Sequence, residues 1–175
     1  IYRLDWTESQ PLDVDLGTLD YRLIQEDGLT YVSLRSFVSG TYDNMLARYA
    51  REGAKARGSK AVIYDLRGNV GGSDSWPRKW IQSFLGTQNS IETSMLYAQK
   101  NSALFAAENS ESLLPEDEGT CFAREVHGTW YENDIPIIVL VDDHCGSSGE
   151  GAVQLLKTLD NVLIVGSNTA GYQLC

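Results

Sequence analysis

The sequence lacks the features that mark several classes of protein. It contains no apolar run of about 18 residues, the length that a membrane-spanning helix needs, and it does not open on a basic segment followed by a hydrophobic one. Lys and Arg number only 14 against 24 Asp and Glu, so the formal net charge is −10. Because phosphate binding needs a basic surface, we expect no nucleic-acid partner. Because no apolar run is long enough, we expect no transmembrane segment within this sequence.

Cysteine and histidine are equally scarce. The three cysteines, Cys121, Cys145 and Cys175, are an odd number without metal-binding spacing, so one disulfide can form but a disulfide framework cannot. The two histidines are His127 and His144. No Gly-x-x-x-x-Gly-Lys phosphate loop is present. The sequence therefore implies no metal and no organic cofactor.

The sequence does contain enough apolar residues for one core. Hydrophobic residues make up 42% of the 175, which suits a single domain over residues 1–175. From the abrupt start and stop we expect this domain to be a fragment of a longer multidomain chain. Ten of the 14 bases lie in residues 35–100, against five acids. This basic middle either favours a substrate carboxylate or reflects solvated helix faces.

Hydrophobic periodicity predicts alternating strands and helices after a β-rich start. Asp27-Gly28 supplies the positive φ angles of a two-residue hairpin turn. Apolar residues at i, i+3, i+4 and i+7 predict a helix that starts after Thr41 and ends before Gly58, with both as caps. We also predict a hairpin of residues 21–26 and 29–38, helices at 75–85 and from 147, buried strands at 61–66, 137–141 and 162–165, and further strands within 91–99 and 121–131.

Ser147 and Ser148 fall where an aliphatic strand ends and a helix begins. A helix N-terminus presents unpaired N–H groups and a positive potential, which would stabilise an oxyanion. The same position is also typical of a helix N-cap. Residues 146–150, Gly-Ser-Ser-Gly-Glu, depart from the Gly-x-Ser-x-Gly elbow at the last position. The local pattern alone leaves a nucleophile and a capping serine both open.

Three loops rich in glycine and hydroxyl groups each follow an aliphatic strand, at residues 67–73, 142–150 and 166–171. In a parallel sheet such loops gather at one edge, where ligands usually bind. Gly71 and Gly72 would let backbone amides approach a substrate without a Cβ in the way. We expect one site built from all three loops.

Four blocks of the sequence resemble the C-terminal processing (tail-specific) peptidases and their tricorn-core relatives. Residues 31–37 are similar to the first strand of that family, and residues 61–72 to its Asp-Leu-Arg-x-Asn-x-Gly-Gly signature. The strand before Asp142 together with residues 147–150 resembles the nucleophile block, and residues 162–166 together with 169–171 resemble the closing block. The resemblance implies an α/β domain of the ClpP/crotonase-like fold, with a central mostly parallel sheet flanked by helices and preceded by a β-hairpin.

Carried over residue by residue, the resemblance implies that Ser147 is the nucleophilic serine. The amide of Ser148 would line the oxyanion hole, and Gly71 or Gly72 would supply the second amide. The resemblance thus assigns one catalytic side chain and two backbone donors.

The sequence departs from the family in its general base. Tyr172 stands where members with a Ser/Lys dyad have the lysine. Tricorn-type members use a histidine ahead of the first strand, and none is found there. His144, three residues before Ser147, and His127 are poor substitutes. Because a serine hydroxyl needs a base to be a good nucleophile, a histidine base is expected outside this chain.

The sequence thus predicts a serine-type endopeptidase or tail-specific protease that hydrolyses peptide bonds through an acyl-enzyme on Ser147, with Asp65 and Glu150 as scaffold. Its partner would be a peptide or protein tail bound in extended form, and the oligomeric state stays unknown. The resemblance implies an extracytoplasmic location, periplasmic or secreted. The alternatives are a noncatalytic peptide- or hydrophobe-binding module of the same fold and a crotonase-type acyl-CoA enzyme.

Overall fold

The structure is a computed structural model that describes residues 21–91 and 130–172 together with the backbone of residues 95–100 and 121–126. Strands and helices alternate along most of this chain, as the periodicity predicted. The elements are β1 Arg22–Glu26, β2 Leu29–Ser33, α1 Asp43–Ala56, β3 Ala61–Asp65, α2 Ser75–Leu85, β4 Met95–Lys100, β5 Cys121–Val126, β6 Ile137–Val141, α4 Ser148–Leu156 and β7 Val162–Gly166.

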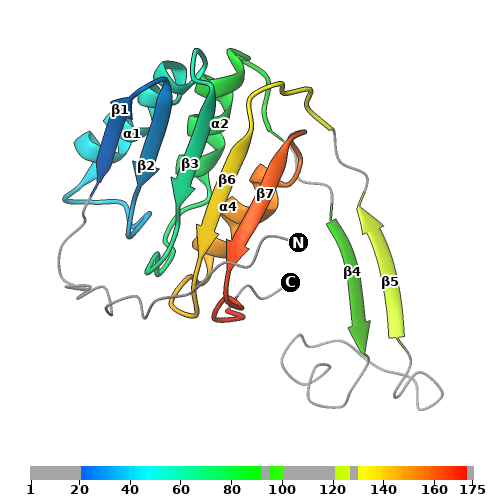
Figure 1. Cartoon of the computed structure of the whole chain (residues 1–175). Coiled ribbons are helices and arrows are strands. Elements are labelled where there is room, and N and C mark those ends of the chain that lie inside the picture. The colour runs from blue at the N-terminus through cyan, green and yellow to red at the C-terminus, as the bar shows by residue number, and fades with distance from the viewer. Residues whose placement is uncertain (1–20, 92–94, 101–120, 127–129, 173–175) are drawn as a thin grey trace, which may run out of the picture.

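Five strands form one sheet in the order β1-β2-β3-β6-β7, and β4 pairs with β5 (Figure 1). β1 and β2 form the predicted hairpin, with positive φ at both Asp27 (52°) and Gly28 (82°). In this sheet β2, β3, β6 and β7 run parallel to one another, and only β1 is antiparallel. The predicted α/β class, with a mostly parallel sheet preceded by a hairpin, is confirmed.

The caps predicted for α1 are wrong at both ends. Tyr42, not Thr41, occupies the N-cap, and the Asp43 carboxylate accepts a hydrogen bond from the backbone N–H of the residue three places before it. This bond closes the turn ahead of α1, and no side chain caps the helix itself. At the other end Arg57 leaves the helix in a right-handed conformation, and Gly58 has no positive φ. For α2 the predicted bounds are confirmed, with a left-handed glycine at its end.

The described helices α1, α2 and α4 lie on one face of the sheet (Figure 1). The row Val32, Tyr64 and Val139 runs across β2, β3 and β6 and is at most 2% exposed. The Tyr64 ring meets Trp80 of α2 edge-on at 4.8 Å, so this row faces the helices. None of the helices in the described ranges is long and apolar enough to cross a bilayer.

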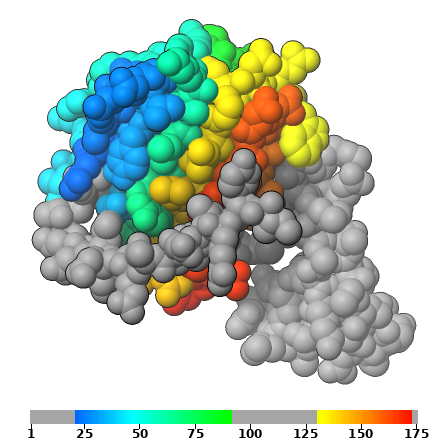
Figure 2. Space-filling model, viewed as in Figure 1, coloured from blue at the N-terminus to red at the C-terminus, as the bar shows by residue number. Residues whose placement is uncertain are grey.

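The opposite face of the sheet is much more open, and Figure 2 views the molecule from that side. β6 is buried only at alternate residues, and Leu163 of β7 is 60% exposed. The prediction that both strands are buried was therefore wrong. The reason is that the described helices cover one face only and that β7 is an edge strand. One cross-strand row on the open face consists of Ile24, Tyr31, Ile63, Ile138 and Leu163.

α1 and α2 approach each other closely at Gly53. A Cβ at this position would lie 2.3 Å from the backbone oxygen of Trp80. Trp80 is fully buried and stacks on Phe84 with ring centroids 5.4 Å apart. The layer of helices is thus held by close backbone packing and aromatic contacts, which fix α2 and the glycine loop that precedes it.

Candidate active site

The loops that follow β3 and β6 meet at the carboxyl edge of the sheet. Ser148 Oγ donates a hydrogen bond to Gly72 O at 2.7 Å, and Gly68 N donates to Asp142 Oδ1 at 2.8 Å. The loop after β7 joins them, since Ala170 N donates to the carbonyl of residue 145 at 2.8 Å. The predicted gathering of three loops at one edge is confirmed.

Ser147 has a strained backbone at the start of α4. Its φ of 52° and ψ of −124° lie in a region that residues with a Cβ rarely adopt, at a cost of about 1–3 kcal/mol. Its backbone N–H donates to Glu150 Oε2 at 3.1 Å, and the residue is exposed. The turn therefore presents the serine to solvent between β6 and α4, as sharp turns that carry nucleophiles do.

Two glycines face this turn, and the structure leaves no room for a side chain at either. A Cβ on Gly71 would lie 2.7 Å from Ser147 Cβ and 2.9 Å from Ser148 N. A Cβ on Gly72 would lie 2.1 Å from the carbonyl carbon of Phe37, which pairs with it in an isolated bridge. The backbone of the glycine loop is thus in direct contact with the Ser147–Ser148 peptide.

The two glycine amides differ in their hydrogen bonding. Gly71 N donates to Asn69 Oδ1 at 2.9 Å, so its hydrogen is already used. Neither Gly72 N nor Ser148 N has an acceptor among the described residues. Gly72 is exposed, whereas Gly71 is buried. Of the two candidates left open by the sequence, Gly72 has the amide that can still donate to a ligand.

Asn69 joins the two loops, and reasoning from the sequence assigned it no function. It is fully buried, and its Nδ2 donates to Leu34 O at 2.7 Å while its Oδ1 accepts from Gly71 N. Its own carbonyl accepts from Gly146 N at 2.9 Å. The only signal in the sequence was its place inside the glycine-rich signature. The arrangement makes Asn69 a positioning residue between the glycine loop and the serine turn.

Glu150 connects the serine turn to the third loop. Its carboxylate is buried and accepts from Ser147 N through Oε2. Its Oε1 accepts from Thr169 Oγ1 and from Gly171 N, both at 2.7 Å. All three donors are fixed by one side chain on the first turn of α4. Glu150 therefore holds the turn in shape and does not point its carboxylate at a substrate.

Asp65 at the end of β3 is a second buried anchor. Its side chain is fully buried and accepts two hydrogen bonds from the Arg67 guanidinium, at 2.9 and 2.8 Å, and one from Tyr31 OH at 2.7 Å. Burial alone would raise the pKa of Asp65, but these hydrogen bonds and the charge of Arg35 together hold the pKa below its ordinary value. The charged form thus fixes the start of the glycine loop.

The candidate bases near Ser147 are few. His144 is exposed, and its Nδ1 lies 2.8 Å from Asp143 Oδ1. His127 lies outside the described residues. Tyr172 lies beside the turn, since a Cβ on Gly146 would be 3.0 Å from Tyr172 Cδ2. Among the described residues, no histidine or lysine side chain is hydrogen-bonded to the Ser147 hydroxyl.

The remaining polar groups of the serine turn suit other chemistry poorly. Cys145 is buried and free, and burial, with the charges of Asp142 and Glu150 adding to it, raises the pKa of its thiol to about 12. Ligand atoms of Asp142, Asp143 and His144 lie within 4.8 Å of one another, but two of the three residues are exposed. Asp142 already accepts from a backbone amide of the glycine loop. Because the pKa of Cys145 is raised, its thiol is a poor nucleophile at neutral pH.

The fold and this site define a class of protein. It is an α/β domain in which an exposed serine with a strained backbone lies at a strand-to-helix turn, in contact with the glycine loop that follows β3. The sequence profile of Peptidase family S41 matches residues 28–175, most of the chain. The chain therefore belongs to Peptidase family S41, in agreement with the ClpP/crotonase-like architecture predicted from the sequence. No curated protein sequence matches the chain.

Several solved structures are similar to this one. A candidate peptidase from Parabacteroides merdae is 24% identical, with 90% of this chain and 48% of that chain covered and a TM-score of 0.49. The photosystem II D1 C-terminal processing protease is 20% identical, with 82% and 31% covered and a TM-score of 0.47. A lipoprotein from Streptococcus agalactiae is 17% identical, with 87% and 50% covered and a TM-score of 0.49. The chain spans half or less of the length of each.

Proposed function

We propose that the protein is a serine peptidase in which Ser147 attacks a peptide carbonyl and forms an acyl-enzyme that water then hydrolyses. The observation that supports this most directly is the strained backbone of Ser147 in contact with Gly71. Strain of this kind persists when surrounding structure imposes it, and it gathers at functional sites. A serine that only capped a helix would need no such conformation, because caps adopt ordinary extended angles.

The proposed oxyanion hole consists of the amides of Ser148 and Gly72. Both are without an acceptor among the described residues, and Ser148 N lies at the positive end of α4. Gly71, the other candidate, contributes by leaving space, because any Cβ there would fill the gap between the two loops. Charge that develops on the carbonyl oxygen would be stabilised by these two donors.

The general base in this proposal is a histidine outside this chain, since no described base reaches Ser147. The substrate class is a peptide or protein tail bound in extended form, which suits a sheet in which β7 is an edge strand among the described strands. An extracytoplasmic site of action is part of the same proposal and rests on the resemblance to processing peptidases alone.

The test is covalent labelling of the full-length protein with a fluorophosphonate probe. We expect labelling of the wild type, none of Ser147→Ala, and normal labelling of Ser167→Ala, a matched change at an exposed serine after β7. Equal labelling of the first variant and the wild type would refute the assignment. If no form is labelled while Ser147→Ala keeps its affinity for peptide, the protein is instead the noncatalytic binding module.

A further inference from the structure

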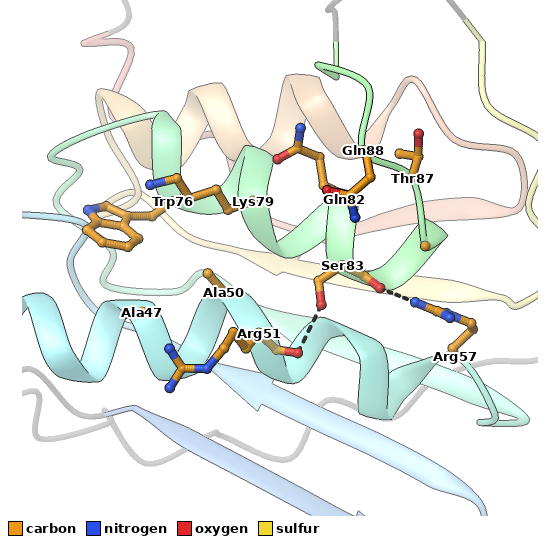
Figure 3. Close-up of a pocket in the computed structure, with 11 residues that line it drawn as sticks. Ala47, Ala50, Arg51, Arg57, Trp76, Lys79, Gln82, Ser83, Thr87 and Gln88 are labelled. Carbon is orange, nitrogen blue, oxygen red and sulfur yellow. Dashed lines mark hydrogen bonds between the residues drawn. The ribbon is translucent and has the colours of Figure 1, made fainter.

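A groove between α1 and α2 lies in the helix layer, apart from the serine turn (Figure 3). It has a volume of about 590 Å³ and is open to solvent. Two alanines of α1, Ala47 and Ala50, form its floor, and such small side chains leave the space between the helices unfilled. Trp76 lies at one end and Arg57 at the other in Figure 3. Polar side chains of α2 and the loop after it form the other wall.

The charge of this groove is opposite to that of the protein. Arg51, Arg57 and Lys79 line it, and no Asp or Glu of the described residues does. The protein as a whole carries a formal charge of −10. A cationic groove on an acidic protein selects anionic ligands locally, because a nearby field outweighs distant charges that salt screens.

Two of the three cations are available to a ligand. Arg57 is committed to the fold, because its Nε donates to Phe84 O at 3.0 Å and its Nη2 to Ser83 O at 2.5 Å, which satisfies carbonyls at the end of α2. Arg51 and Lys79 are exposed and, among the described residues, form no ion pair. Arg51 belongs to α1 and Lys79 to α2, so the two charges lie on the two walls of the groove, where separate carboxylates of one acidic segment could contact them.

Two contacts position the Trp76 side chain at its end of the groove. The indole Nε1 donates to Ser39 Oγ at 2.9 Å, and Lys79 Nζ lies 4.6 Å from the ring centroid. This cation–π contact holds the ammonium group over the ring without neutralising it. The indole also offers an apolar face to a neighbouring aliphatic or aromatic group. The groove thus combines fixed positive charge with a platform for a side chain.

We propose that this groove binds an acidic peptide segment, with one carboxylate at Arg51, another at Lys79 and a neighbouring side chain on Trp76. The inference is independent of the proposed peptidase activity, since it concerns a different surface. It gives a function to two bases of the basic middle, Arg51 and Lys79, that form no ion pair among the described residues.

The test measures fluorescence anisotropy of a fluorescein-labelled peptide with alternating glutamates, added to the full chain at low salt. We expect the double variant Arg51→Gln/Lys79→Gln to bind about fivefold more weakly, which corresponds to two exposed ion pairs. The matched control is Lys60→Gln/Lys157→Gln, which removes the same charge at exposed lysines outside the groove. It should bind like the wild type, as should Ser147→Ala.

Two further arms sharpen the result. A peptide with glutamine at every glutamate position should bind more weakly than the acidic one, and inorganic phosphate at millimolar concentration should compete poorly. The proposal is overturned by an absence of binding, by equal binding of the two peptides, by equal losses in the two double variants, or by phosphate displacing the peptide completely. Arg51→Gln alone, at an exposed position, repeats the test if the double variant is unstable.

Discussion

The site edge and the helix layer are held together by different forces. At the carboxyl edge of the sheet, Asn69, Asp142 and Glu150 tie three loops together through hydrogen bonds to backbone amides. In the helix layer, Gly53 and Trp80 hold α1 against α2 through close packing. Loops lack a hydrogen-bonding pattern of their own, so buried polar side chains must supply it. Substitutions that change side-chain size should therefore destabilise the helix layer most. Substitutions that remove a polar group should disrupt the loops of the candidate site most.

The largest effect is expected in the helix layer. Gly53→Ala introduces a methyl group 2.3 Å from a backbone oxygen that cannot rotate away, so we expect a loss of about 3 kcal/mol in the free energy of unfolding. Urea unfolding followed by tryptophan fluorescence measures it. Gly58→Ala is the matched control, because a Cβ there meets nothing within 4 Å, and it should be neutral or slightly stabilising.

Asn69→Ala should have the next largest effect. It leaves Leu34 O and Gly71 N buried without their partners, at a cost of about 2 kcal/mol in the free energy of unfolding. Labelling of Ser147 by the fluorophosphonate probe should fall more than the folded fraction does. Val70→Ala, at a position 54% exposed, should change neither quantity. Labelling that only tracks the folded fraction would show that Asn69 has no positioning function.

Acid sensitivity should distinguish Asp65 from surface aspartates. Its pKa is lowered in the folded protein, so its charge contributes stability that is present above the unfolded pKa of about 3.9 and is lost as the pH falls through the folded value. We expect Asp65→Asn to cost about 1.5 kcal/mol at neutral pH, and the difference from the wild type to begin to shrink only once the pH falls below about 3.9. Stability measured between pH 7 and 3 tests this, with Asp134→Asn as the exposed control.

The smallest effect is expected at Ser147 itself. Ser147→Gly should be about 1 kcal/mol more stable than Ser147→Ala, because only glycine adopts φ 52° and ψ −124° without strain. Thermal or urea unfolding of the two variants measures the difference. Equal stabilities would mean that the backbone of this turn is not strained, and the main support for a nucleophile here would disappear.

Much of the fold could be predicted from the sequence because it depends on local patterns. The Asp27-Gly28 turn, the bounds of α2 and the aliphatic strands follow from turn chemistry and periodicity, which act over a few residues. The predicted burial of β6 and β7 failed for a nonlocal reason. An aliphatic run signals a strand, but whether each face is covered depends on which side of the sheet the helices lie.

At the candidate site, the sequence by itself determined the types of residue, namely a serine at a strand-to-helix turn and a glycine pair on another loop. Only the tertiary structure shows that the Gly71 amide already donates to Asn69, whereas the Gly72 amide has no acceptor among the described residues. It also revealed the groove cations, which lie 28 positions apart on different helices. Contacts between distant residues follow from how the chain folds back on itself, and local pattern carries no information about them.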